Sequence, residues 1–165
     1  MPSKPTVIDG LEFARSGKRL SGQLKIAELD RLADGLVSDS GGLEWTLLGQ
    51  HSEGQAGQFE LKLAIAGALQ LRCQRCLEPL LLLLEIDKRL LLVAPGKDWP
   101  EEDAENESVD AVAASTEMAV DELIQDEVLL GLPIAPRHDD CDPPTAGATK
   151  QDASPFAILQ QLKRD

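Results

Sequence analysis

Apolar and polar residues alternate along residues 43–48 and 58–65, which is the pattern of strands with one buried face. Residues 49–57 between them contain Gly and Ser and are typical of a hairpin loop. Residues 68–72 extend the second strand, with a bulge expected at Gly67. Residues 80–93 are almost continuously apolar. We expect a return strand there, after a tight cysteine-containing turn, although a buried helix has the same composition.

Two other segments have apolar residues spaced three and four apart, which predicts amphipathic helices over residues 26–36 and 118–130. Pro133 is expected to end the second helix. Residues 155–163 repeat the pattern over a shorter length. The order of elements predicts an α+β domain with a curved, partly barrel-like antiparallel sheet of about five strands, packed with two or three helices.

Charge and aromatic content limit the functions that this domain can have. The chain has 29 acidic and 16 basic residues, a net charge of -13, three Phe, two Trp and no Tyr. Such a protein repels phosphate backbones and offers few rings for base stacking, so contact with nucleic acid should be local or indirect. Residues 98–110 hold seven carboxylates and predict an acidic mobile loop.

The domain is expected to span residues 1–138, followed by a linker and a short amphipathic segment in residues 139–165, which begin with polar and proline-containing sequence. No apolar run reaches the roughly 18 residues of a membrane span, and residues 1–10 lack the apolar core of a signal peptide. Three cysteines cannot all pair within one chain. We therefore expect a cytoplasmic protein without a disulfide framework.

The cysteines suggest two alternatives. A turn at Cys73-Gln74-Arg75-Cys76 would place two sulfurs close enough to share a metal, and His138 and Cys141 would complete a Cys3His set of the kind that structural zinc sites use. Alternatively the turn is a recognition surface, with Arg72 and Arg75 contacting a partner or a few phosphates. We favour the second interpretation, because the linker-like residues after Pro136 give little reason for Cys141 to be held in place.

Catalytic interpretations have weaker support. A thioredoxin-like dithiol needs its first cysteine at a helix N-terminus, whereas strand-like residues precede Cys73 and Pro79 follows the motif. A nuclease would present ordered carboxylates for Mg²⁺, but those of this chain gather in the expected mobile loop. No P-loop, dinucleotide fingerprint or HExxH motif occurs. We predict a protein that is not an enzyme. The alternatives are a thiol redox or RNA-processing enzyme, or a structural zinc module that docks to another protein.

Three sequence motifs, in order and spacing, resemble the bacterial YceD family, the large ribosomal RNA subunit accumulation proteins. They are the cysteine turn at residues 73–76, the run DEVLLGLPIAPRH at residues 126–138, and SPFAILQQLK at residues 154–163. The resemblance implies a role in synthesis, processing or stability of 23S ribosomal RNA and assigns no catalytic residue. Because the chain is so acidic, we expect it to act through a protein partner.

Within the matching motifs and beside them we predict contacts with that partner or with RNA at Arg72, Cys73, Arg75, Cys76, Pro79, Asp126, Glu127, Pro133, Pro136, Pro155 and Phe156. No cofactor is expected, apart from the structural zinc ion that Cys73, Cys76, His138 and Cys141 would hold in the alternative interpretation.

Overall fold

The computed structural model describes residues 6–52, 57–99 and 109–144. Five strands form one sheet in the order β2-β3-β4-β5-β6, with bounds β2 (Arg19–Lys25), β3 (Gly42–His51), β4 (Phe59–Arg72), β5 (Pro79–Val93) and β6 (Val109–Ala113). A second, two-stranded sheet pairs β1 (Val7–Ile8) with β7 (Met118–Ala119). The helices are α1 (Gly10–Arg15), α2 (Val120–Gly131) and two 3-10 segments, η1 (Ile26–Glu28) and η2 (Asp30–Gly35).

The α+β class and the long hairpin are confirmed. β4 and β5 pair antiparallel from Arg72 opposite Pro79 to Phe59 opposite Leu92. Gly67 lies in register opposite Leu84, so the strand continues without the expected bulge. The sheet is mixed, because β6 runs parallel to β5, and it is not closed into a barrel, because β2 and β6 are two separate edges.

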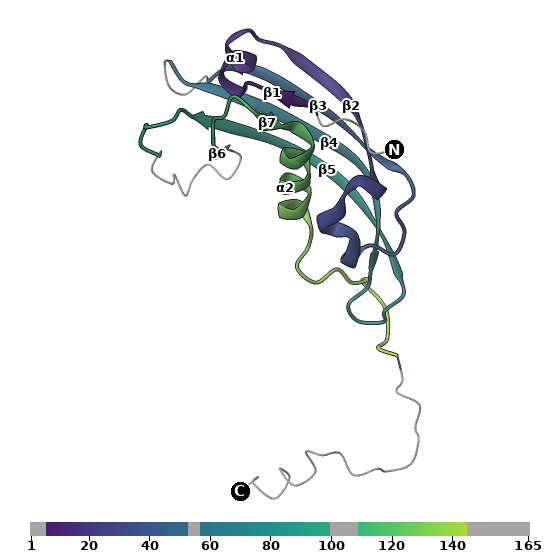
Figure 1. Cartoon of the computed structure of the whole chain (residues 1–165). Coiled ribbons are helices and arrows are strands. Elements are labelled where there is room, and N and C mark those ends of the chain that lie inside the picture. Colours follow the sequence, from purple (N-terminus) through teal and green to yellow (C-terminus); the bar gives the residue numbers. More distant parts are fainter. Residues whose placement is uncertain (1–5, 53–56, 100–108, 145–165) are drawn as a thin grey trace, which may run out of the picture.

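The core lies on one face of the sheet. Figure 1 shows the long strands bending round α2, which lies on the concave side. Leu43, Leu63 and Ile65 of the sheet are buried together with Ile124 and Val128 of α2. Alternate residues point to opposite faces of a strand, so the residues between them are on the other side. The row Gln23, Glu44, Ala66 and Glu85, which pair across four strands, marks what we call the outer face.

Residues 26–36 are not the expected α-helix. They form η1 and η2, separated at Leu29, whose ψ of 65° interrupts the helical backbone. The apolar spacing was still informative, because Ile26, Leu29 and Leu32 are buried. Leu36 then forms a bridge with Leu71 of β4, so this segment follows the sheet rather than lying across it as a separate helix.

Three further elements differ from the sequence-based expectation. α2 begins at Val120, because Met118 and Ala119 pair with β1. β6 includes Asp110, which was expected in the acidic loop. The short helix α1 was not predicted; Asp9 caps it by accepting a hydrogen bond from the Glu12 amide at 2.9 Å.

Several expectations concern residues outside the described ranges: most of the acidic loop (residues 100–108), most of the linker and the amphipathic segment at residues 155–163. Within the described ranges, no helix has the length and apolar character that crossing a bilayer requires.

Candidate metal centre

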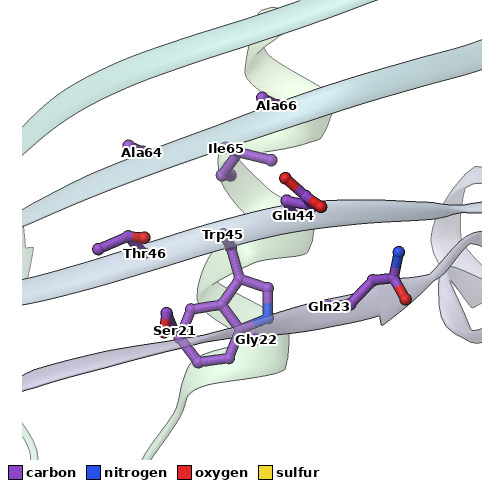
Figure 2. Close-up of a pocket in the computed structure, with 9 residues that line it drawn as sticks. All are labelled: Ser21, Gly22, Gln23, Glu44, Trp45, Thr46, Ala64, Ile65 and Ala66. Atoms are coloured by element: carbon purple, nitrogen blue, oxygen red, sulfur yellow. The ribbon is translucent and has the colours of Figure 1, made fainter.

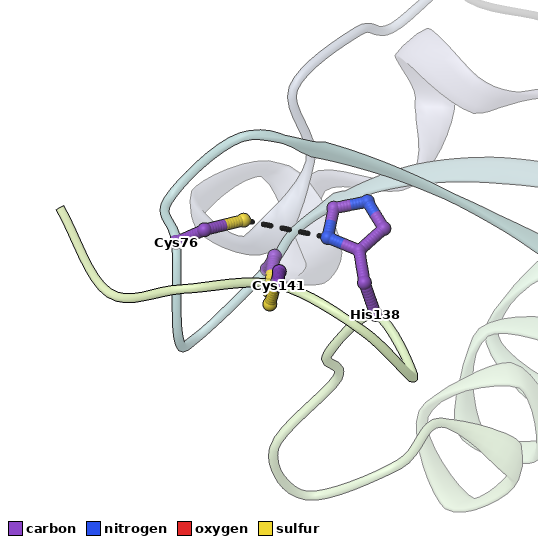
Figure 3. A group of neighbouring side chains, drawn as sticks. Cys76, His138 and Cys141 are labelled. Atoms are coloured by element: carbon purple, nitrogen blue, oxygen red, sulfur yellow. Dashed lines mark hydrogen bonds between the residues drawn. The ribbon is translucent and has the colours of Figure 1, made fainter.

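Four side chains that are far apart in the sequence meet at the turn between β4 and β5. The ligand atoms of Cys73, Cys76, His138 and Cys141 all lie within 4.8 Å of one another. The Sγ atoms of Cys73 and Cys141 are 3.7 Å apart, and Cys76 Sγ is 3.3 Å from His138 Nδ1. Figure 3 shows Cys76 directed at the imidazole of His138, with Cys141 beside them.

The local backbone explains how the CxxC pair is presented. The Cys73 amide donates to the Glu78 carbonyl at 2.9 Å, which closes the hairpin, and the Leu77 amide donates to the Cys73 carbonyl at 3.0 Å. Leu77 has a φ of 67°, a left-handed conformation that is uncommon for residues other than Gly. This tight turn keeps both cysteines on the side that faces the segment after α2.

That segment is fastened to the turn by contacts that do not involve the ligand atoms. The Gln74 amide donates to the Pro136 carbonyl at 2.8 Å, and the Arg75 guanidinium donates to the Cys141 carbonyl at 3.1 Å. The expectation that Cys141 would not be held in place is therefore wrong. The residues after Pro136 were expected to form a linker because of their composition. Composition does not show that Arg75 and the Gln74 amide hold this segment against the turn.

The two ring nitrogens of His138 have different neighbours: Nδ1 faces the cysteines, and Nε2 faces the backbone of Pro79. Nε2 lies 3.1 Å from the Pro79 carbonyl oxygen, which can only accept a hydrogen bond. In the neutral ring, Nε2–H is therefore the donor to this carbonyl, and Nδ1 presents its lone pair to the cysteines. A histidine ligand that donates its other N–H to a carbonyl is a common arrangement around protein-bound metals.

The environment of the sulfurs favours thiolate at one position. Burial alone would raise the pKa of Cys73, but the backbone amides of Cys76, Arg75 and His138 direct their N–H groups at its sulfur and lower the pKa to about 5. Burial raises the pKa of Cys141 to about 11, together with its hydrogen bonds to the other two cysteines and their negative charge. Without a bound cation, repulsion between the negative charges therefore disfavours ionising all three cysteines at once.

The donor set and spacing fit a tetrahedral zinc ion. Zinc–sulfur bonds of about 2.3 Å place two sulfur ligands about 3.8 Å apart at a tetrahedral angle. The 3.7 Å separation of Cys73 and Cys141 agrees with this value, and the widest ligand pair would have to close by about 1 Å. Four protein ligands would fill the coordination sphere, which is the arrangement of structural rather than catalytic zinc sites.

The other predicted contact residues lie in different places. Arg72 and Pro79 are exposed beside the centre, and Arg75 is partly buried by its contact with Cys141. Pro133 is exposed and Pro136 partly buried in the segment after α2. Pro155 and Phe156 lie outside the described residues.

Asp126 and Glu127 lie on α2, away from the metal centre. Asp126 forms an ion pair with Arg31 of η2. Glu127 is only 4% exposed, and its Oε2 has no hydrogen-bond partner among the described residues. Burial, then repulsion by Asp110, raises the pKa of Glu127. Acidic residues of an amphipathic helix usually lie on its wet face, but Glu127 follows Val120 by seven residues, a spacing that places it on the apolar stripe of α2.

A separate hollow of about 560 Å³ lies on β2, β3 and β4 (Figure 2). Its lining includes Ser21, Gln23 and Thr46, and its one charged lining residue is Glu44. Trp45 contributes little open surface, because its side chain packs over Gly22 and is 9% exposed. The hollow therefore lacks both the exposed ring and the positive charge of a nucleic-acid site.

The fold and centre define a small acidic α+β protein with a closed Cys3His candidate metal site. Residues 61–163 match the family model described as large ribosomal RNA subunit accumulation protein YceD, and the chain belongs to this family. The match includes most of β4, the cysteine turn and α2. No curated protein and no solved structure matched the chain.

Proposed function

We propose that this protein supports the accumulation of 23S ribosomal RNA in the cytoplasm as a non-catalytic factor that acts through a protein partner. Membership of the YceD family carries the proposal, since the family is described by large-subunit rRNA accumulation. The charge of -13 favours a basic protein partner over direct binding to the RNA backbone.

In this proposal Cys73, Cys76, His138 and Cys141 hold a structural zinc ion. The ion would neutralise the thiolates and join the β4–β5 turn to the segment after α2. Exposed residues of both parts would then form one contact surface, including Arg72, Leu77 and Ile134. Two of these three are large apolar side chains on the surface, which is typical of a protein contact rather than an RNA contact.

The geometry gives the thiol redox alternative less support. Cys73 is the cysteine with the lowered pKa, but it is fully buried, so a disulfide substrate has no approach to its sulfur. The RNA-processing alternative would need clustered carboxylates that bind Mg²⁺. Two of the described carboxylates, Glu60 and Asp126, are each paired with an arginine instead, which gives this alternative little support.

Deletion of the gene, with the ratio of 23S to 16S rRNA as the readout, tests the function. We expect the ratio to fall and to recover with the wild-type chain, while the purified protein cleaves no precursor rRNA. An unchanged ratio would contradict the proposal. Metal-dependent RNA cleavage that a change in the chain's own carboxylates abolishes would support the enzyme alternative.

A further inference from the structure

One side of β5 lacks a partner strand over much of its length. β4 pairs with β5 from Pro79 to Leu92, whereas β6 pairs only with residues 89–93. Along residues 80–88, the described chain places no strand on the second side of β5. Figure 1 shows β6 at the far end of the strand, away from the cysteine turn.

The register shows which backbone groups face this open edge. The bond from the Cys73 amide to the Glu78 carbonyl makes this a hydrogen-bonded pair, and such pairs recur at every second residue of an antiparallel ladder. Even-numbered residues from Leu80 to Lys88 therefore direct their N–H and C=O groups at β4. The residues between them, Leu81, Leu83, Glu85 and Asp87, direct theirs outward.

A contact at the start of the strand fits this alternation. Pro79 has the same parity as Leu81, and its carbonyl is the group that meets His138 from outside the sheet. Among the described residues, no backbone hydrogen bond satisfies the outward groups of Leu81, Leu83, Glu85 and Asp87. Unpaired groups of this kind on a sheet edge can bind an added strand.

The side chains of these four residues lie on the outer face and divide into two kinds. Leu81 is 63% exposed and Leu83 is 77% exposed. Glu85 and Asp87 follow them and are also exposed, and Asp87 forms an exposed ion pair with Lys62 at 3.5 Å. The edge thus presents two apolar positions and then two acidic ones at the two-residue spacing with which an extended chain presents its side chains.

The opposite edge of the sheet provides a contrast. The bond from the Gly49 amide to the Lys18 carbonyl fixes the register of β2, whose outward residues are Arg19, Ser21, Gln23 and Lys25. All four are exposed and polar, and two are basic. Charged residues, especially Lys, protect edges from pairing with other chains. β2 has this protection, whereas β5 exposes two leucines.

We infer that the open edge of β5 binds an extended segment of another protein by strand addition, with apolar residues over Leu81 and Leu83 and basic residues over Glu85 and Asp87. The inference rests on the proposed function, because it specifies how the protein partner is bound. Backbone hydrogen bonds supply affinity in this mode, and alternate side chains supply specificity. The acidic half of the edge and the net charge of -13 select a basic segment.

Two other occupants fit less well. The β2 edge of a second copy would offer basic residues to Glu85 and Asp87 but no apolar residue to the leucines. The chain's own residues 101–107 include five carboxylates, which Glu85 and Asp87 would repel.

The experiment uses the full-length, ¹⁵N-labelled protein and a short synthetic peptide, the Val–Lys peptide, in which Ser alternates with Val, Val, Lys and Lys. One face of this extended peptide presents two apolar and then two basic side chains, and its Val–Glu counterpart has Glu in place of both Lys. We expect the amide resonances of Leu81, Leu83, Glu85 and Asp87 to shift on titration, and a Val–Glu peptide to bind at least about tenfold more weakly. Leu83→Pro removes one outward N–H without disturbing the β4 ladder and should weaken binding by about tenfold or more. The matched change on the other edge, Ser21→Pro, should leave the affinity unchanged.

Leu83→Ser preserves the backbone, adds no charge and should also weaken binding, so it tests the apolar contact if the proline variant fails to fold. The inference is overturned if the Val–Lys peptide does not bind, if Ser21→Pro weakens binding equally, or if the four outward amides are already protected from exchange in the free protein. In the deletion strain, a folded Leu83→Ser chain that fully restores the rRNA ratio would refute the edge and leave the proposed function intact. A deletion that does not lower the ratio would refute the function itself.

Discussion

Glu127 is a buried carboxyl group whose ionised form has little support. Burial raises its pKa above 4.5, and the nearby Asp110 and Asp126 act in the same direction, while Lys88 opposes them. The folded state therefore binds this proton more tightly than the unfolded state, so stability is lost as pH rises from about 4.5 through the folded-state pKa. This carboxyl should make the protein less stable at neutral pH than in mild acid.

Glu127→Gln removes the ionisation and keeps the shape of the side chain. We expect the variant to be more stable than wild type at pH 7, by about 1 kcal/mol, and to lose this advantage near pH 4. Urea unfolding at both pH values measures it. Glu44→Gln, at an exposed position, serves as the control and should stay within about 0.5 kcal/mol. Equal or lower stability of Glu127→Gln at pH 7 would contradict the argument.

Glu60 is the opposite case, a fully buried carboxylate with partners. Arg89 contacts both its oxygens, at 3.2 and 2.9 Å, and Gln50 donates to Oε1. Burial alone would raise its pKa, but the bonds from Arg89 and Gln50 outweigh burial and lower it. The stability that this pair contributes at neutral pH should therefore be lost as pH falls below about 4.5.

Arg89→Ala leaves the Glu60 carboxylate buried without its cation, and we expect a loss of about 3–5 kcal/mol at pH 7. Lys62→Ala breaks the exposed pair with Asp87 in the neighbouring position and should cost less than about 1 kcal/mol. Chemical denaturation of both variants gives the comparison. Similar losses would show that burial of Glu60 does not matter.

At the scale of elements, α1 approaches the sheet closely at one glycine. A Cβ atom at Gly49 of β3 would lie 2.6 Å from both the Ala14 Cα and the Phe13 carbonyl oxygen. These are backbone atoms, which cannot move aside as a flexible side chain can. The glycine therefore allows α1 to pack directly on β3.

Gly49→Ala should force α1 away from the strand and cost about 1–3 kcal/mol, the range of overpacked sites. Gly35→Ala, where an added Cβ meets nothing within 4 Å, should be neutral or slightly stabilising. Thermal unfolding monitored by circular dichroism compares the two. A neutral Gly49→Ala would mean that α1 is not packed on β3 as described.

The sequence predicted these elements unevenly, for physical reasons. Alternation and length were sufficient for β3, β4 and β5, because their burial repeats with the two-residue period of a strand. Periodicity also found the buried residues of 26–36, but it could not distinguish an α-helix from two 3-10 turns, since both bury residues three apart. β6 was not predicted, because its five residues directly follow a run of carboxylates and are too few to show a strand pattern of their own. Its pairing with β5 is a tertiary contact.

The candidate site shows a similar limit. The sequence pointed to all four residues, Cys73 and Cys76 in the CxxC motif and His138 with Cys141 further on, but the interpretation that we favoured did not bring them together. The close approach of Cys141 depends on backbone contacts from Gln74 to Pro136 and on Arg75, which no spacing rule encodes. Tertiary contacts of this kind, rather than local pattern, decide whether four ligands meet.

At the scale of the whole molecule, the metal centre would connect two distant parts of the chain. A 61-residue interval separates Cys76 from His138 in the sequence, and the metal centre would join its two ends at one end of the curved sheet. A bound ion would stabilise the folded state by the free energy of its binding, so chelation should lower the melting temperature. The end that carries Leu77 and Ile134 should be affected first.

The most direct test of the central claim is the metal content of the protein, purified without a histidine tag and measured by inductively coupled plasma mass spectrometry. We expect about one zinc ion per chain in wild type and in His51→Ala, and almost none in His138→Ala, which should also unfold at a lower temperature. His51 is the only other histidine in the chain and packs on Phe59, away from the centre. Wild-type protein without metal, whose stability neither zinc nor a chelator changes, would contradict the account.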